Sequence, residues 1–325
     1  MRRMIGLLLP LGVLSLLIFA SPALAVEDPA VVRGNKAYNE SRYAEAEQAF
    51  IEAIQTSPER PEAYRNLART YFWQDQYSAA TAYYDFYIRL NPQGEDAEQI
   101  RSERRLASNR AGGEAWTMPE SQRMALRALQ NELDEGRAYT AGAGGAWGLY
   151  RALLRMQYAQ PDLAVMRRQL LRRLVDEFEG HLIASEHQPS PILDLDDWKV
   201  QEERLAAARR ISDDELVEDM LRRRELIVRA AQALLNHQFD HAVRLSAQAA
   251  EENPDMLFVN WYRITALTRS GKLEAALEVL ETFARRLAQT APHHLSYARI
   301  MRASLLRTMG REEDAAEMYV EMFWE

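Results

Sequence analysis

The sequence predicts an all-α solenoid built from pairs of helices, and three observations lead to this prediction. First, a short pattern recurs after 34 residues, so that Tyr43 returns as Tyr77. Second, the apolar residues of each period fall at helical spacing in two runs, which a polar break separates. Third, a proline stands at the end of each period, at Pro58 and at Pro92. A fixed period of this kind is typical of proteins in which each helix pair packs on the next.

The period is clearest across residues 61–94, where it contains Tyr64, Leu67, Ala68, Tyr71, Tyr77, Ala80 and Tyr84. Ala68 and Ala80 are expected where the two helices approach closely, because a larger side chain would push them apart. Pro92 ends the second helix, since it has no N–H to donate and clashes with the preceding turn. Neither helix is long enough to be stable alone in water, so each must bury its apolar stripe on its neighbours.

These repeated positions resemble those of the tetratricopeptide repeat family. In the first unit they are Gly34, Tyr43, Ala46, Phe50, Ala53 and Pro58. Near the C-terminus they are Ala230, Phe239, Ala242, Ala249, Pro254, Gly271, Leu273, Ala276, Leu280, Phe283, Gly310, Ala315, Tyr319 and Met322. The last unit comes about five residues late, so the helix or loop before it must be longer. The resemblance covers roughly half of the mature chain and implies a right-handed superhelix.

Four segments follow from this pattern. Residues 1–25 are predicted to be a signal peptide, residues 26–94 an N-terminal pair of tetratricopeptide repeats, residues 95–225 an atypical helical region, and residues 226–325 the C-terminal repeat units. The middle segment has helical patterns that do not follow the repeat. It is interpreted either as atypical helix pairs that continue the superhelix or as an inserted helical domain.

The first segment has the three-part layout of a secretory signal. Arg2 and Arg3 precede an apolar stretch over residues 5–20, and the small-residue site at 23–25 follows. The apolar stretch is short for a membrane span. The sequence therefore predicts export through a cleaved signal peptide, to the periplasm in a Gram-negative cell, with an uncleaved membrane anchor as the alternative.

Composition narrows the possible functions. The chain has no cysteine, which excludes disulfides, thiolate metal sites and a catalytic thiol. Its net charge of −8 has interspersed signs, which argues against nucleic acid or anionic lipid as the main partner.

Three stretches contain residue types found in ligand sites, but each lacks what the site requires. Residues 141–148 are glycine-rich, yet the lysine and Ser/Thr of a phosphate loop do not follow. His237 and His241 are expected on either side of a turn rather than on one helix face, without the further ligands of a zinc site. The aspartates at 194, 196 and 197 lack the glycine and late glutamate of a calcium loop and suit a helix start. The sequence predicts no catalytic residue, no metal site and no cofactor.

The family resemblance implies a concave groove lined by the first helix of each pair. The N-terminal units would contribute Asn35, Tyr38, Asn39, Arg65, Asn66, Arg69, Phe72 and Trp73. The C-terminal units would contribute Trp261, Thr265, Arg269, Tyr297, Ser304 and Arg307. Asparagine amides pair with the backbone of an extended peptide, arginines bind carboxylates, and aromatic rings serve as anchors.

Two of these residues resemble a known clamp. Asn35 and Asn66 match positions of the carboxylate clamp in chaperone-binding members of the family. Val31 stands where that clamp has a lysine, and no clear lysine–arginine pair follows. A general peptide or protein groove is therefore favoured over a clamp for peptide C-termini.

The final predicted helix has an apolar face formed by Met318, Tyr319, Met322, Phe323 and Trp324. Either these side chains pack back onto the preceding repeat, or they form an edge that docks a partner, a second copy or a membrane surface.

The sequence thus predicts a non-catalytic periplasmic scaffold that binds a peptide or protein partner in a cell-envelope assembly, export or secretion pathway. One alternative is an enzyme or carbohydrate-binding protein with its site in residues 95–225. Another is a membrane-anchored assembly factor.

Overall fold

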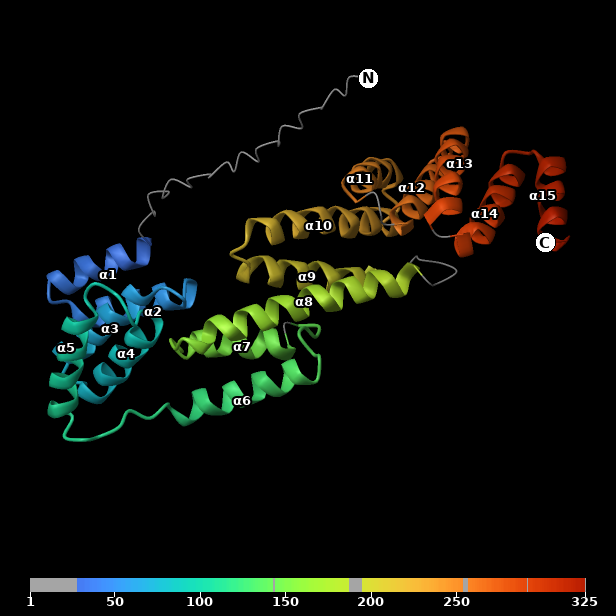
Figure 1. Ribbon diagram of the computed structural model, residues 1–325. Coiled ribbons are helices and arrows are strands. Elements are labelled where there is room, and N and C mark those ends of the chain that lie inside the picture. Colours follow the sequence, from blue (N-terminus) through green and yellow to red (C-terminus); the bar gives the residue numbers. More distant parts are fainter. Residues whose placement is uncertain (1–27, 143, 187–194, 254–256, 291, 325) are drawn as a thin grey trace, which may run out of the picture.

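The computed structural model describes residues 28–142, 144–186, 195–253, 257–290 and 292–324. These residues form fifteen α-helices and one short 3-10 helix, and none of them belongs to a β-sheet. The predicted all-α class is confirmed. The helices follow one another along an elongated body, from α1 near one end to α15 at the other (Figure 1). The predicted signal peptide lies outside the described residues.

The N-terminal unit consists of α1 (Pro29–Asn39), α2 (Tyr43–Thr56), α3 (Pro61–Trp73), α4 (Tyr77–Leu90) and α5 (Ala97–Arg110). The carboxylate of Asp28 starts α1 by accepting a 2.8 Å hydrogen bond from the backbone N–H of Ala30. Ala68 and Ala80 are fully buried between α3 and α4, where the repeat predicts a close approach. Pro92 follows the end of α4 and prevents its continuation.

The turn between the helices of a pair recurs along the chain. One residue of each turn has a left-handed backbone, and these residues are Ser41, Asp75, Gln157, His237, Gly271 and Gly310. The backbone N–H of the following residue then bonds a carbonyl of the preceding helix, as from Gln238 to Ala233 at 2.9 Å. Because Gln157 lies in the middle segment, that segment uses the same turn as the repeats on either side.

The middle segment contributes α6 (Glu120–Asp134), α7 (Gly145–Arg155), α8 (Asp162–Glu186) and α9 (Leu195–Ile211). The C-terminal helices are α10 (Glu215–Leu235), α11 (Phe239–Glu252), α12 (Leu257–Arg269), α13 (Leu273–Thr290), α14 (Leu295–Thr308) and α15 (Glu312–Trp324), with a 3-10 helix at Pro292–His294. The long α13 and this 3-10 helix account for the late start of the last repeat.

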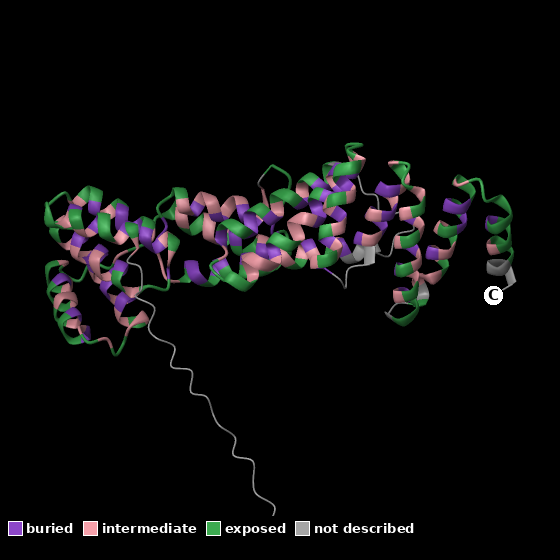
Figure 2. Ribbon diagram, turned by 90° about the horizontal axis from the view of Figure 1, so that it is seen from above, coloured by how far each residue is buried: buried purple, intermediate pink, exposed green. Residues whose placement is uncertain are grey.

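Two hydrophobic cores divide the molecule after α5. The first holds the N-terminal unit together with Ala159 of the α7–α8 connection, and Trp116 of the α5–α6 connection packs against it. The second runs without a break from Leu129 on α6 to Leu305 on α14, so the middle and C-terminal helices share one core. Figure 2 shows the buried residues as a series along the helices rather than as one central cluster.

Polar contacts join the N-terminal unit to the rest of the chain. Gln55 on α2 donates a 2.8 Å hydrogen bond to the carbonyl of Leu154, at the end of α7. The buried guanidinium of Arg167 on α8 donates to the carbonyl of Thr56 at 2.6 Å and pairs with Asp213. Gln55 and Arg167 therefore both join the N-terminal unit to the helices that follow it.

The C-terminal helix exposes part of its apolar face. Tyr319 and Val320 on α15 are exposed, while the side chains of residues 321–325 are not described. Met322, Phe323 and Trp324 are among these residues, so the question whether the edge packs back or docks a partner lies largely outside the described side chains. No helix in the described parts of the chain is both long and apolar enough to span a membrane.

Candidate functional site

The first helices of the N-terminal unit, α1, α3 and α5, bring the predicted groove residues together. Asn66 on α3 donates a 2.9 Å hydrogen bond from its amide to the amide oxygen of Asn35 on α1. One hydrogen bond therefore links the two asparagines between repeats. This contact uses one of the donors that a bound peptide would need.

Arg65 ties α3 to the start of α5. Its guanidinium lies 2.6 Å from a carboxylate oxygen of Asp96, and its Nε donates to the Asn66 amide oxygen at 3.2 Å. Burial alone would raise the pKa of Asp96. Hydrogen bonds from Tyr87 and Arg65 outweigh this effect and hold that pKa below its usual range.

Arg69 and Glu103 form a second link between α3 and α5. Two guanidinium nitrogens of Arg69 reach the two carboxylate oxygens of Glu103 at 2.9 and 2.8 Å. Tyr84 and Gln99 also donate to this carboxylate, at 3.0 and 2.9 Å. Burial pushes the pKa of Glu103 upward, but Arg69 and the other donors lower it further than burial raises it. The carboxylate is thus held charged and paired.

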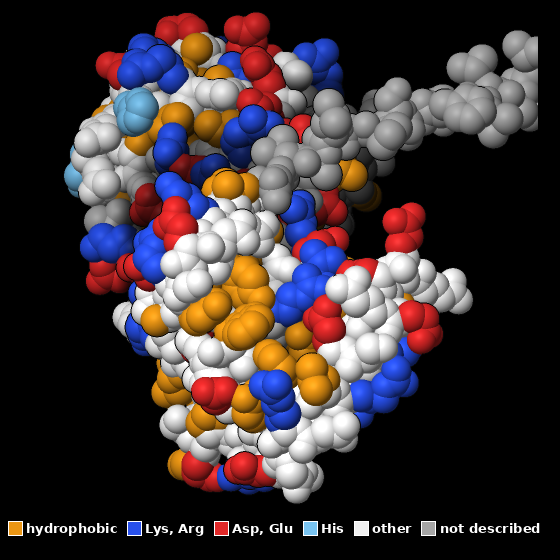
Figure 3. Space-filling view, turned by 90° about the vertical axis from the view of Figure 1, so that its left-hand side faces the viewer, with side chains coloured by type: hydrophobic (Ala, Val, Ile, Leu, Met, Phe, Trp, Pro, Cys, Tyr) orange, Lys and Arg blue, Asp and Glu red, His pale blue; other side chains and the backbone are white. Residues whose placement is uncertain are grey.

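Beside this ion pair lies a cavity of about 210 Å³, which we call the aromatic cavity. It is lined by Tyr38, Arg69, Phe72, Trp73, Tyr84, Glu103 and Leu106. Trp73 is 58 % exposed, and its ring stacks on that of Tyr43 at 6.4 Å between centroids. Seen from this end of the molecule, hydrophobic side chains gather in a patch bordered by charged ones (Figure 3).

Comparison with known proteins assigns the repeats. Residues 35–105 match the sequence model of the tetratricopeptide repeat family. Residues 35–105 carry tetratricopeptide repeats. The match begins within α1 and passes the predicted boundary at residue 94, so it includes most of α5.

Among solved structures, one similar to this chain is the crystal structure of the P58(IPK) TPR domain, at 12 % sequence identity. The alignment covers 90 % of this chain and 91 % of that one, with a TM-score of 0.30. No curated protein sequence matches the chain.

Asn35 and Asn66, which match two positions of the carboxylate clamp, are bonded to each other rather than free. Asn35 and Asn66 line a second cavity of about 610 Å³, which Val31 also lines. Two cationic residues, Arg60 and Arg65, also line this cavity, and Arg65 is paired with Asp96.

The predicted residues of the C-terminal repeats lie at the other end of the molecule from those of the N-terminal unit (Figure 1). Trp261 is only 6 % exposed, because its ring packs between Phe283 and Tyr297 at 4.8 and 4.9 Å. It belongs to the core rather than to an open groove surface. Arg269 lies exposed at the end of α12, and Asn39 lies exposed at the end of α1.

Sequence reasoning missed Glu103 and Leu106, because it placed α5 in the atypical region. The repeat itself carried the signal, since Glu103 follows Arg69 by 34 residues. Extending the frame by one more helix would have placed both residues in the tetratricopeptide groove.

The other motifs lie on the surface or at helix starts. His237 occupies a turn and His241 lies in the first turn of α11, and both are exposed. Asp196 and Asp197 lie in the first turn of α9, as predicted for a helix start, while Asp194 lies outside the described residues.

In the middle segment, a cavity of about 530 Å³ lies at the junction with the N-terminal unit. It is lined by Trp147, Arg151, Arg167, Arg210 and Asp213 among others. Its carboxylates come from Glu52, which pairs with Arg33, and from Asp213, which pairs with Arg167.

Proposed function

We propose that this protein is a non-catalytic scaffold of the periplasm, whose N-terminal tetratricopeptide repeats bind an apolar segment of a partner protein. The partner would belong to a cell-envelope assembly, export or secretion pathway. The aromatic cavity would receive one apolar or aromatic side chain of that segment, with Trp73 as its exposed wall.

The observation that carries this proposal is the exposed Trp73 beside a cavity whose charges are already neutralised. A solvent-exposed tryptophan is costly in water and is a common anchor in protein interfaces. Arg69 and Glu103 are the charged residues that line the cavity, and they pair with each other. A carboxylate would have to displace Glu103 from Arg69, whereas an apolar side chain would not. The cavity therefore favours an apolar partner residue.

The variant that tests this proposal must change the aromatic cavity without breaking the contacts between repeats. Alanine at Asn35, Asn66 or Arg69 would break contacts between repeats. Such a variant would disturb the folding of this unit as well as its binding of a partner. Trp73→Ala combined with Leu106→Gln removes exposed apolar surface and leaves those contacts in place. Leu216→Gln is the matched control, because Leu216 is 80 % exposed on α10, outside the N-terminal unit.

The experiment is cross-linking in cells of an epitope-tagged chain, followed by mass spectrometry of the captured proteins. We expect the same envelope protein to be captured by the wild type and by Leu216→Gln, and to be lost with the double variant. Capture that survives the double variant would contradict the proposal.

Location needs a separate measurement. The layout of residues 1–25 supports export, and cleavage after Ala25 would give a mature chain that starts at Val26. Fractionation and N-terminal sequencing are expected to find the Val26 form in the periplasm. A chain that keeps Met1 and pellets with membranes would instead indicate an anchored protein.

A further inference from the structure

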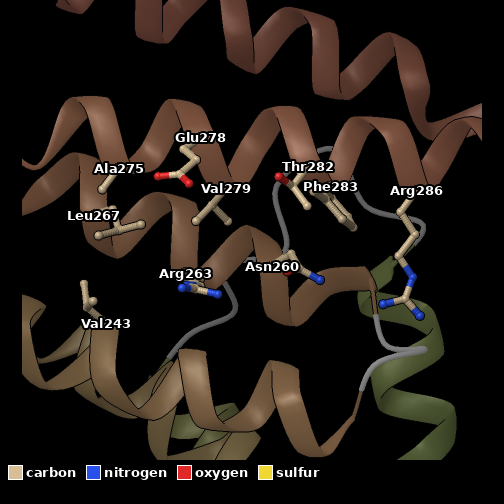
Figure 4. A pocket seen from close by; sticks show the side chains of 10 residues that line it. All are labelled: Val243, Asn260, Arg263, Leu267, Ala275, Glu278, Val279, Thr282, Phe283 and Arg286. Atoms are coloured by element: carbon tan, nitrogen blue, oxygen red, sulfur yellow. The ribbon is translucent and has the colours of Figure 1, made fainter.

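A cavity of about 400 Å³ lies between α11, α12 and α13, in the C-terminal repeats. This volume falls within the range of small-molecule sites. Apolar walls come from Val243 on α11, Leu267 on α12, and Val279 and Phe283 on α13. Figure 4 shows the lining side chains of α12 and α13 around this space.

Two polar side chains of α12 line the same cavity. Asn260 and Arg263 are three residues apart, so they lie on one face of the helix. Within the described parts of the chain, neither side chain has a hydrogen-bond or ion-pair partner. The Nε of Arg263 is buried from solvent in this state.

An arginine nitrogen that is buried without a partner destabilises the folded protein, because its lost hydration is not replaced. Glu278 on α13 lines the same cavity but does not pair with Arg263, whereas Glu281 on the same helix pairs with Arg302 of α14 at 3.0 Å. Arg263 and Asn260 instead present unused donors to a cavity. Such an arrangement suits a bound anion.

The charges that line the cavity limit the kind of anion. Arg263 contributes a cation whose buried Nε has no partner, and Glu278 contributes an anion to the same lining. A single negative charge can pair with Arg263, whereas Glu278 repels a dianion more strongly than a monoanion. The apolar walls require the anionic group to carry an apolar substituent.

We propose that this cavity binds a carboxylate attached to an apolar group, with Arg263 as its cationic partner and Asn260 as a second donor. The carboxylate belongs either to a free small acid or to the C-terminal residue of a peptide. The site is separate from the aromatic cavity and does not depend on the function proposed for it.

N-acetyl-leucine and N-acetyl-leucine amide are the matched probes, because they differ in the carboxylate alone. Calorimetric titration of the full chain is expected to show binding of the amide that is weaker by at least about tenfold in Kd. Loss of one charged hydrogen bond weakens affinity by about this factor. Equal binding of acid and amide, or binding of neither, would overturn the proposal. Inorganic phosphate is expected to bind more weakly than the acid, and tighter binding of phosphate would also overturn it.

Arg263→Gln is expected to lose the binding of N-acetyl-leucine, and Asn260→Ala to weaken it. Arg229→Gln, at an exposed arginine of α10, should bind as the wild type does. Without ligand, Arg263→Gln should melt at or above the temperature of the wild type, because the arginine has no partner to lose. A large drop in melting temperature, or unchanged binding in this variant, would refute the role of Arg263.

A peptide that ends in leucine with a free carboxylate distinguishes the two sources. Tighter binding of Gly-Gly-Ala-Leu than of N-acetyl-leucine would support a peptide C-terminus as the natural ligand. Weaker binding of the peptide would support a small free acid, and the carboxylate site stands in both cases.

Discussion

Arg69 on α3 and Glu103 on α5 form a bidentate ion pair, with N–O distances of 2.9 and 2.8 Å, between residues that are 34 positions apart in the sequence. The groove arginine that would bind a partner's carboxylate is thus already occupied by a carboxylate of its own chain. The pair links α5 to α3, and it neutralises the two charged side chains that line the aromatic cavity. Recognition is left to the exposed apolar side chains beside it.

Glu103→Gln is expected to lower the free energy of unfolding by about 1 kcal/mol at neutral pH, because Arg69 loses its counter-charge. The pKa of Glu103 in the folded state lies below its ordinary value of 4.5, so the pair stabilises the fold above that pH. This contribution is lost as the pH falls through the lower, folded-state pKa. Urea unfolding from neutral to acidic pH should therefore show a shallower loss of stability in the variant. Glu98→Gln on the same helix is the control, and an equal effect there would contradict the prediction.

Trp73→Ala is expected to change the free energy of unfolding by less than about 1 kcal/mol, because most of the ring is already in water. Tyr64→Ala on the same helix removes a fully buried ring and should cost about 3 to 5 kcal/mol. Chemical denaturation of the two variants measures the difference. A large loss of stability in Trp73→Ala would show that this side chain is structural.

His237→Gly is expected to raise the stability by about 0.5 kcal/mol, because His237 has a φ of 59°, which glycine adopts without strain. His241→Gly, in the regular helix α11, should lower it by a similar amount. Thermal melts of both variants test the opposite signs. Destabilisation by both would mean that the left-handed turn stores no strain.

Gly34→Ala is expected to destabilise the N-terminal unit by about 1 to 3 kcal/mol, since its Cβ would lie 2.4 Å from the ring of Phe50. Gly180→Ala on α8 has open space around it and should stabilise the helix by about 0.5 to 1 kcal/mol. Unfolding followed by circular dichroism compares the two. If Gly34→Ala is neutral, the Phe50 ring can move aside.

Arg167→Ala is expected to cost about 2 kcal/mol and to loosen the N-terminal unit from the rest of the chain. The buried guanidinium is lost from the carbonyl of Thr56 and from Asp213. Small-angle scattering should show a larger radius of gyration. Arg168→Ala, at the exposed neighbouring position, should leave both stability and scattering unchanged.

Much of the fold could be predicted because each repeat has the same apolar spacing and the same small residues where its helices meet. Ala68 and Ala80 are buried where the helices meet, and the long α13 explains the late last unit. The site was harder to predict, because a position in the frame says which helix carries a residue but not what its side chain contacts. Trp261 and Trp73 both lie on predicted groove helices, yet Trp261 is packed between two rings and Trp73 is exposed.

The sequence by itself determined the helix pairs, their turns and the small residues at their close approaches, because these depend on local spacing and conformation. Only the tertiary structure decided that Asn35 bonds Asn66 and Arg69 bonds Glu103. It also decided that Asn260 and Arg263 have no partner among the described residues around their cavity. The physical reason is that pairing between repeats depends on how far one helix is displaced along its neighbour, and apolar periodicity does not encode that displacement.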